Sequence, residues 1–302
     1  MFIVYSLWFF VTLAFATGSF IFYQLMQQSR LSISFITNNS LKFLIYSLVI
    51  SRVLAIISNP TYFFRTDPET GFSLFGSLIN FITFWDKELS FWGGLIGFFF
   101  VFVREAMNEK QPFAKWADIL TISVITAISI GNIGAYLDGI NYGRPTILPW
   151  GVTFQSSFVK YAIDIHPTQI YAFLYSSLIA LFLYFLYNKY RAQYDGLITY
   201  VGFFLFSSFR FIEGFFRGDD TITLAFNNPD SLLRFIRVPE LIFLTVAILS
   251  FRLMRKYQEK YQIPVFSLIS NKIKLWQQFS QKVWQHKIKP FLNNKLNKNK
   301  SS

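Results

Sequence analysis

The stretch that decides the fold is MFIVYSLWFFVTLAFATGSFIFYQLMQQ, residues 1–28, which contains no charged side chain. A helix needs about 20 mostly apolar residues to cross the ~30 Å hydrocarbon core of a bilayer. No Lys or Arg precedes the apolar run, and no small-x-small cleavage site closes it, which favours a retained anchor over a cleaved signal peptide. The segment therefore predicts a membrane-spanning helix.

Similar runs recur along the chain, at residues 43–60, 89–103, 119–137, 166–187, 196–213 and 236–251. The run 89–103 is short enough to form a buried or re-entrant segment instead of a full crossing. Charged residues make up only 15% of the 302 residues, whereas a soluble domain carries roughly 25%. The sequence predicts an all-α polytopic membrane protein with about seven transmembrane helices in residues 1–251, followed by a basic amphipathic tail, 252–302.

Lys and Arg are distributed unevenly between the two sides of the predicted topology. With seven crossings, one side holds 19 of these cations and the other holds 7. Cation-rich loops stay in the cytoplasm, so the N-terminus is predicted to lie outside and the C-terminal tail in the cytoplasm. The net charge of +12 is then a signal of orientation and lipid contact, and no nucleic-acid partner is expected.

The tail has a pattern of its own, with Ile269, Ile273, Trp276, Phe279 and Val283 spaced three or four residues apart among lysines. This pattern suits a basic amphipathic helix on anionic lipid, and a solvated charge run is the alternative. The chain contains no cysteine, which excludes disulfides, thiolate metal sites and a cysteine nucleophile of its own.

Three charged residues interrupt the end of the sixth predicted span, in Arg210-Phe-Ile-Glu213-Gly-Phe-Phe-Arg217. At ~100° per helical residue their side chains fall within about 60° and share one face. Ionisable groups in a membrane are costly and usually functional. Two guanidinium forks held by one carboxylate suit an anionic phosphate. The alternative is an ion-pair network that only locks helices together.

The segment His166-Pro-Thr-Gln169-Ile-Tyr171 opens the fifth predicted span. Pro167 suits the first turn of a helix, and His166 and Gln169 then share a face. A helix N-terminus attracts phosphate and disfavours the imidazolium form. Because the other histidine, His286, lies in the tail, His166 is the candidate proton acceptor, with a structural hydrogen-bonded histidine as the alternative. One membrane-embedded histidine does not favour a zinc site.

Small and polar residues gather at two further predicted helix ends. Gly131-Asn132 ends the fourth span, where glycine permits close backbone approach and Asn132 brings an amide into an apolar helix. Gly93-Gly94 begins the third span, and paired glycines let helices or lipid approach closely.

The predicted topology brings all of these places to one membrane face. Arg144, in a Gly-Arg-Pro turn after the fourth span, and Tyr5 join them at the outer side. This convergence favours an outward-facing functional site over separate structural accidents such as ordinary loops with packing glycines.

Together the motifs resemble those of the phosphatidylglycerol-prolipoprotein diacylglyceryl transferases. The family's G-R-x-G-N-F-x-N-G-E-x-x-G-R-P-T-x-L-P-W-G is similar to residues 128–151, which contain Gly131-Asn132 and Gly143-Arg144-Pro-Thr-Ile-Leu-Pro-Trp-Gly. Its H-P-S-Q-L-Y-E is similar to residues 166–172, its M-S-F-H-G-G-L-x-G to residues 89–97, and its R-F-x-x-E-x-x-R-x-x-D to residues 210–219. Tyr5 and Arg52 resemble an N-terminal W-Y-G-L element and a second-span arginine, so the resemblance covers residues 1–251 in order.

The resemblance implies transfer of a diacylglyceryl group from phosphatidylglycerol to the lipobox cysteine thiol of prolipoproteins, with release of glycerol phosphate. It implies a multi-pass protein of the bacterial plasma membrane that acts in lipoprotein maturation with no cofactor. Its partners would be phosphatidylglycerol, other membrane lipids and prolipoprotein signal peptides. The expected catalytic residues are His166, Arg210 and Glu213, and the expected substrate-binding residues are Tyr5, Gly93, Gly94, Gly131, Asn132, Arg144, Gln169, Tyr171 and Arg217.

The chain departs from the family pattern at several functional positions. Trp92 replaces a histidine assigned to thiol activation, Ser129 replaces an arginine assigned to the lipid phosphate, and Ala172 replaces a glutamate. Glu213 follows Arg210 by three residues instead of four. The alternatives are a catalytically impaired member that binds anionic phospholipid or lipoprotein signal segments, and an unrelated transporter, which should show broken helices near the bilayer midplane.

Overall fold

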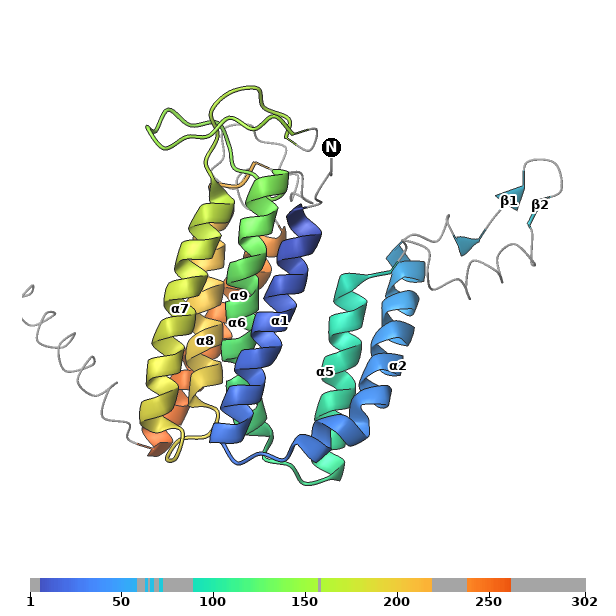
Figure 1. The fold of residues 1–302 in the computed structure, drawn as a ribbon, viewed down its shortest axis with the longest axis vertical. Coiled ribbons are helices and arrows are strands. Elements are labelled where there is room, and N and C mark those ends of the chain that lie inside the picture. Colours follow the sequence, from blue (N-terminus) through green and yellow to red (C-terminus); the bar gives the residue numbers. More distant parts are fainter. Residues whose placement is uncertain are drawn as a thin grey trace, which may run out of the picture.

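The computed structural model describes residues 6–58, 63–64, 66–67, 71–72, 89–156, 159–218 and 238–261. Seven long helices lie within these ranges (Figure 1): α1 (Ser6–Gln28), α2 (Ile33–Ser58), α5 (Phe91–Asn108), α6 (Phe113–Asp138), α7 (Thr168–Tyr190), α8 (Leu197–Gly214) and α9 (Val238–Tyr261). Among the same residues the only strands are β1 (Thr66–Asp67) and β2 (Gly71–Phe72), which pair antiparallel.

The seven helices match the seven predicted runs in order. Five of them, α1, α2, α6, α7 and α8, are long and apolar enough to cross a membrane. α5 and α9 carry charged side chains in their C-terminal halves, such as Arg104 and Lys256. The prediction of an all-α polytopic membrane protein is confirmed, and the chain is a multi-pass membrane protein.

The helices are arranged as a bundle and a separate hairpin. α1, α6, α7, α8 and α9 stand together, whereas α2 and α5 form a hairpin apart from α7 and α8 (Figure 1). α1 packs closely on α6 at Gly134 of α6. A Cβ at that position would lie only 2.7 Å from the Cβ of Phe10 in α1. The hairpin contacts the bundle through Trp116, a fully buried side chain whose ring lies 5.3 Å from that of Phe35 and 6.1 Å from that of Phe102.

Two helix boundaries differ most from the prediction. α2 begins at Ile33, ten residues earlier than the predicted 43, because the charge of Lys42 is paired with Glu105 of α5 at 2.9 Å and does not stop the helix. α9 continues past the predicted end of the last span at residue 251 to Tyr261. The division into a membrane domain and a tail remains a prediction, and the pattern from Ile269 to Val283 lies outside the described residues.

A buried carboxylate fixes the start of α8 against α6. Asp118 of α6 accepts hydrogen bonds from the backbone N–H of Gly196 at 2.7 Å and of Thr199 at 2.8 Å, and from the Thr199 hydroxyl at 2.7 Å. The first N–H groups of a helix have no partner within that helix. Asp118, from the neighbouring helix α6, accepts hydrogen bonds from the N–H groups of Gly196 and Thr199 at the start of α8. This cap sets the position of α8, and with it the face that carries Arg210 and Glu213.

Candidate functional site

The candidate site lies at the loop end of the bundle, defined as the end that carries residues 139–167. α6 stops there at Gly139, which adopts φ 74°, and Asn141 adopts φ 57°. Glycine reaches this left-handed region without strain, and asparagine is among the side chains that tolerate it. The two residues turn the chain back across the helix ends.

The turned chain pairs with the segment that follows α8. The N–H of Arg144 donates to the carbonyl of Phe216 at 2.8 Å, and the N–H of Gly218 donates to the carbonyl of Tyr142 at 2.9 Å. Gly143 lies opposite Arg217 in this pairing. The two motifs are thereby joined although more than 60 residues separate them in the sequence.

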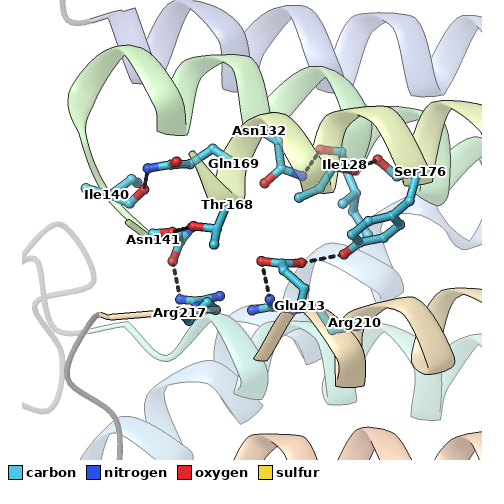
Figure 2. A network of polar contacts seen from close by, with 12 residues as sticks. Ile128, Asn132, Ile140, Asn141, Thr168, Gln169, Ser176, Arg210, Glu213 and Arg217 are labelled. Carbon is cyan, nitrogen blue, oxygen red and sulfur yellow. Dashed lines mark hydrogen bonds and ion pairs between the residues drawn. The ribbon is translucent and has the colours of Figure 1, made fainter. Parts of the chain in front are cut away.

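A third segment, the start of α7, closes the arrangement. The N–H of His166 donates to the carbonyl of Arg144 at 2.9 Å. The hydroxyl of Thr168 donates to the carbonyl of Asn141, and the Gln169 amide donates to the carbonyl of Ile140, both at 2.7 Å. Figure 2 shows Thr168 and Gln169 on one side of the space between the helices, with Arg210, Glu213 and Arg217 on the other.

Glu213 is the buried centre of the polar cluster. Its carboxylate is 5% exposed and lies 2.6 Å from Nη1 of Arg210, one turn away on α8. Its other oxygen accepts a 2.7 Å hydrogen bond from the phenol of Tyr175 in α7. The predicted shared face is confirmed for Arg210 and Glu213 (Figure 2). A carboxylate held from two sides fixes the direction of the Arg210 guanidinium.

The second arginine of the motif is held by the turned loop. Nη2 of Arg217 donates to Oδ1 of Asn141 at 2.8 Å, and the backbone carbonyl of Arg217 accepts from Nε of Arg144 at 2.8 Å. The sequence predicted that one carboxylate, that of Glu213, would hold both Arg210 and Arg217. The structure adds Asn141 as a partner of Arg217, and it brings Arg144 into the same cluster as a third guanidinium.

His166 lies beside this cluster in an aromatic setting. Its ring is 5.2 Å from that of Phe216, the residue before Arg217. Its Nδ1 lies 3.2 Å from the phenolic oxygen of Tyr171, which also accepts a 2.7 Å hydrogen bond from the indole N–H of Trp150. Burial lowers the pKa of His166 below its usual 6.5, so the imidazole is neutral at pH 7. When Nδ1–H donates to Tyr171, Nε2 keeps the lone pair that a proton acceptor needs.

An apolar groove opens next to the His166–Tyr171 pair. Its volume is about 490 Å³, and its wall is formed by the start of α7, the end of α6 and the loop between them. The lining residues are Tyr136, Trp150, Val152, Pro167, Ile170, Tyr171 and Leu174. Tyr171, which lies beside His166, therefore also borders a surface suited to hydrocarbon.

The predicted glycines take different positions. At Gly131, no atom of the described residues outside its own stretch of α6 lies within 4 Å of where a Cβ would be, so the structure shows open space there. Gly93 does permit close approach, with the Cα of Ser51 in α2 only 2.6 Å from a Cβ there, while at Gly94 the nearest atoms are 3.9 Å away. Gly93 belongs to α5, and Gly94 follows it there; α5 and α2 form the hairpin that stands apart from α7 and α8 (Figure 1).

Two further positions singled out in the sequence, Asn132 and Ser129, lie within α6. The amide of Asn132 donates to the carbonyl of Ile128 in its own helix at 2.8 Å. Ser129 is buried, and its hydroxyl lies 2.6 Å from that of Ser177 in α7. Tyr5 lies outside the described residues.

Sequence reasoning missed Tyr175 and Asn141 as members of the cluster. Tyr175 lies in an apolar helix rich in tyrosine and phenylalanine, where its hydroxyl carries no distinguishing signal. Asn141 lies within residues 128–151, the stretch whose sequence resembles a family motif. Its preference for the left-handed conformation was the available signal.

The sequence is similar to those of known proteins. The sequence profile described as prolipoprotein diacylglyceryl transferase matches residues 2–255. Among curated proteins, phosphatidylglycerol–prolipoprotein diacylglyceryl transferases are similar to the chain: that of Paracidovorax citrulli is 29% identical over 160 residues, and that of Geobacter sulfurreducens is 30% identical over 166. That of Clostridium tetani is 31% identical over 172 residues.

These matches cover 52%, 55% and 57% of the chain. They span 58%, 62% and 61% of the respective relatives, so the similarity reaches about six-tenths of their length. The profile match, in contrast, takes in every described helix except the last turns of α9. The chain belongs to the prolipoprotein diacylglyceryl transferase family.

Proposed function

We propose that this protein transfers a diacylglyceryl group from phosphatidylglycerol to the cysteine thiol of a prolipoprotein lipobox. The family membership and the names of the relatives support the reaction. The observation that carries the proposal is that three arginines lie at one end of a membrane bundle: Arg210 is paired with the buried Glu213, Arg217 donates to Asn141, and Arg144 donates to the backbone of Arg217. Such a cluster of guanidinium groups suits the phosphate of an anionic lipid.

The reaction replaces one bond to the lipid glycerol by another. The thiolate sulfur attacks the glycerol carbon that bears the phosphate, a C–S thioether bond forms, and the C–O bond breaks. Glycerol phosphate leaves with the electron pair, and the negative charge of its phosphate grows. Arg210 and Arg217 would stabilise that charge, since fixed donors aimed at developing charge lower the barrier.

The thiol proton needs an acceptor, because a thiol with pKa ~8.5 is mostly protonated at neutral pH. We propose His166 for this role. It is neutral because burial lowers its pKa, and Tyr171 lies within reach of Nδ1. The apolar groove beside Tyr171 would hold acyl chains or the hydrophobic part of a signal peptide.

We further propose that the loop end faces outward from a bacterial plasma membrane. The 19 against 7 division of cations supports this orientation. Gln169 is proposed to hold the loop in place through the hydrogen bond that its side-chain amide donates to the carbonyl of Ile140. Tyr5, Gly93, Gly94, Gly131 and Asn132 are proposed as positions along the path of lipid or peptide. A reporter fused after Lys300 should be active only in the cytoplasm and one inserted near Asp67 only outside, and the reverse pattern would refute the orientation.

Complementation tests the proposed function in cells. In bacteria depleted of their own transferase, expression of the protein should restore growth and the lipid modification of lipoproteins. Protein that is present in the membrane but restores neither would contradict the proposal, and would favour a family member that binds the substrates without turning them over.

A further inference from the structure

The loop between α6 and α7 carries a group of exposed apolar side chains. Ile147 is fully exposed, Trp150 and Ile163 are each more than half exposed, and Leu148 is also exposed. We call these four residues the apolar tip. Apolar side chains that are exposed singly are ordinary on protein surfaces, whereas a group of them marks a surface that contacts a partner or a membrane.

Backbone hydrogen bonds hold the apolar tip in a defined shape. The N–H of Gly151 donates to the carbonyl of Leu148 at 2.9 Å, which closes a turn. The N–H of Thr146 donates to the carbonyl of Asp164, also at 2.9 Å. Each of these last two residues is next to an isoleucine of the tip, so the two isoleucines lie on adjoining segments. The tip is a preformed surface.

Trp150 joins the apolar tip to the outer face of α7. Its indole N–H donates to the hydroxyl of Tyr171 at 2.7 Å, and its side chain lines the apolar groove together with Leu174. At Leu174 begins a row of exposed apolar residues at helical spacing, which continues with Leu178, Leu181 and Phe185. Because α7 is apolar and long enough to span a membrane, this row faces lipid, and the tip continues it.

We propose that the apolar tip inserts into the lipid leaflet on its side of the membrane and anchors the loop there. The partner is lipid because the tip prolongs a lipid-facing row of a spanning helix. Trp150 also has the character of a residue at a membrane–water interface, with an apolar ring and a hydrogen-bonded N–H. None of the four tip residues is charged, so their transfer from water into the leaflet is favourable.

The anchor would set the depth of the guanidinium cluster in the membrane. Arg144 lies three residues before Ile147, and its Nε donates to the carbonyl of Arg217 at 2.8 Å. A tip held at the boundary between headgroups and acyl chains keeps these arginines near the level of the lipid phosphates. This consequence for catalysis rests on the proposed function, whereas the insertion of the tip does not.

The first test measures the depth of the tip directly. The chain has no cysteine, so Ile147→Cys and Ile163→Cys each carry one nitroxide label in the full-length protein. In phosphatidylglycerol vesicles, collisions with oxygen, which concentrates in the bilayer, should exceed those with a water-soluble nickel complex. Gln155→Cys is the matched control, because Gln155 is an exposed polar residue of the same loop, and its label should favour the nickel complex.

Two outcomes of this measurement would overturn the anchor. One is a label at residue 147 that favours the nickel complex as strongly as the label at residue 155. The other is a label that is protected from the nickel complex only after a lipobox peptide is added, which would make the tip a peptide-binding surface instead.

The second test asks whether the anchor sets the depth of the arginines. The double variant Ile147→Ser/Ile163→Ser should transfer lipid from vesicles ~10 to 100-fold more slowly, since a misplacement of about 1 Å can cost the larger factor. In micelles of a neutral detergent, which have no bilayer to set the depth, its rate should equal that of the wild-type protein. Equal losses in vesicles and micelles, or no loss in vesicles, would overturn this role. Inserted labels in a wild-type protein that transfers no lipid would overturn the proposed function alone.

Discussion

The phenol of Tyr175 in α7 donates a hydrogen bond of 2.7 Å to the carboxylate of Glu213 in α8. The same carboxylate binds Arg210 at 2.6 Å, so the direction of the guanidinium depends on a tyrosine of another helix. The ring of Tyr175 is itself stacked on Phe209, with centroids 5.5 Å apart. The aromatic packing between α7 and α8 thus orients the charged group proposed to bind the lipid phosphate.

Tyr175→Phe should keep this packing and remove the hydrogen bond. Loss of a partner by a buried charged group costs about 1–3 kcal/mol, so the unfolding temperature in detergent should fall. Lipid transfer should also fall, because Arg210 loses part of its orientation. Tyr184→Phe is the control, since Tyr184 lies on the exposed side of the same helix. Equal stability of the two variants would contradict the role of Tyr175.

Arg210 should be needed for turnover as a guanidinium and not only as a positive charge. Arg210→Lys keeps the charge, but an ammonium group cannot reproduce the bidentate fork. We expect Arg210→Lys to retain less than about a tenth of the wild-type transfer rate, a loss of roughly 1.4 kcal/mol in transition-state stabilisation. Full activity of Arg210→Lys in protein of normal stability would show that Arg210 is structural.

The sequence predicted the helices well because each requires a long apolar run, which is a local property. It also predicted that four motifs lie at one end of the helices. It did not predict the partners Tyr175 and Asn141, because such contacts depend on how α7 and the loop meet α8. Nor did it predict the open space beside Gly131 among the described residues, because a glycine shows that close approach is permitted, not which neighbour uses it.

Gly143 in the loop and Gly131 within α6 should respond differently to a methyl group. A Cβ on Gly143 would lie 2.6 Å from the Cβ and 2.9 Å from the backbone carbonyl carbon of His166, so Gly143→Ala should force the loop off α7 and lower the unfolding temperature. Gly131→Ala should leave it equal or higher, because the space is open and alanine favours a helix by about 1 kcal/mol. Equal unfolding temperatures of the two variants would contradict the described loop packing.

His166 should act in proton transfer and not in lipid binding. His166→Gln should lower the rate of thioether formation ~100 to 10,000-fold while phosphatidylglycerol binding changes only a few-fold. Loss of stability and binding together would instead indicate a structural hydrogen-bonding role.

The pH dependence of the rate gives an independent check of His166. A proton acceptor works in its neutral form, so the rate should rise with pH as the imidazolium loses its proton. Because burial lowers the pKa of His166, the midpoint of this rise should lie below the usual value of about 6.5. The acidic limb should be absent from the residual rate of His166→Gln, and a limb that persists there unchanged would assign the proton to another group.

We propose that this chain catalyses transfer with Trp92 and Ser129 at positions where the motifs it resembles have a histidine and an arginine. The most direct measurement incubates the purified protein with phosphatidylglycerol vesicles and a lipobox peptide, and follows the peptide by mass spectrometry. We predict a peptide whose mass increases by one diacylglyceryl group, with glycerol phosphate released in equal amount, and no such product from Arg210→Ala. A folded protein that binds phosphatidylglycerol but leaves the peptide unmodified would contradict the account.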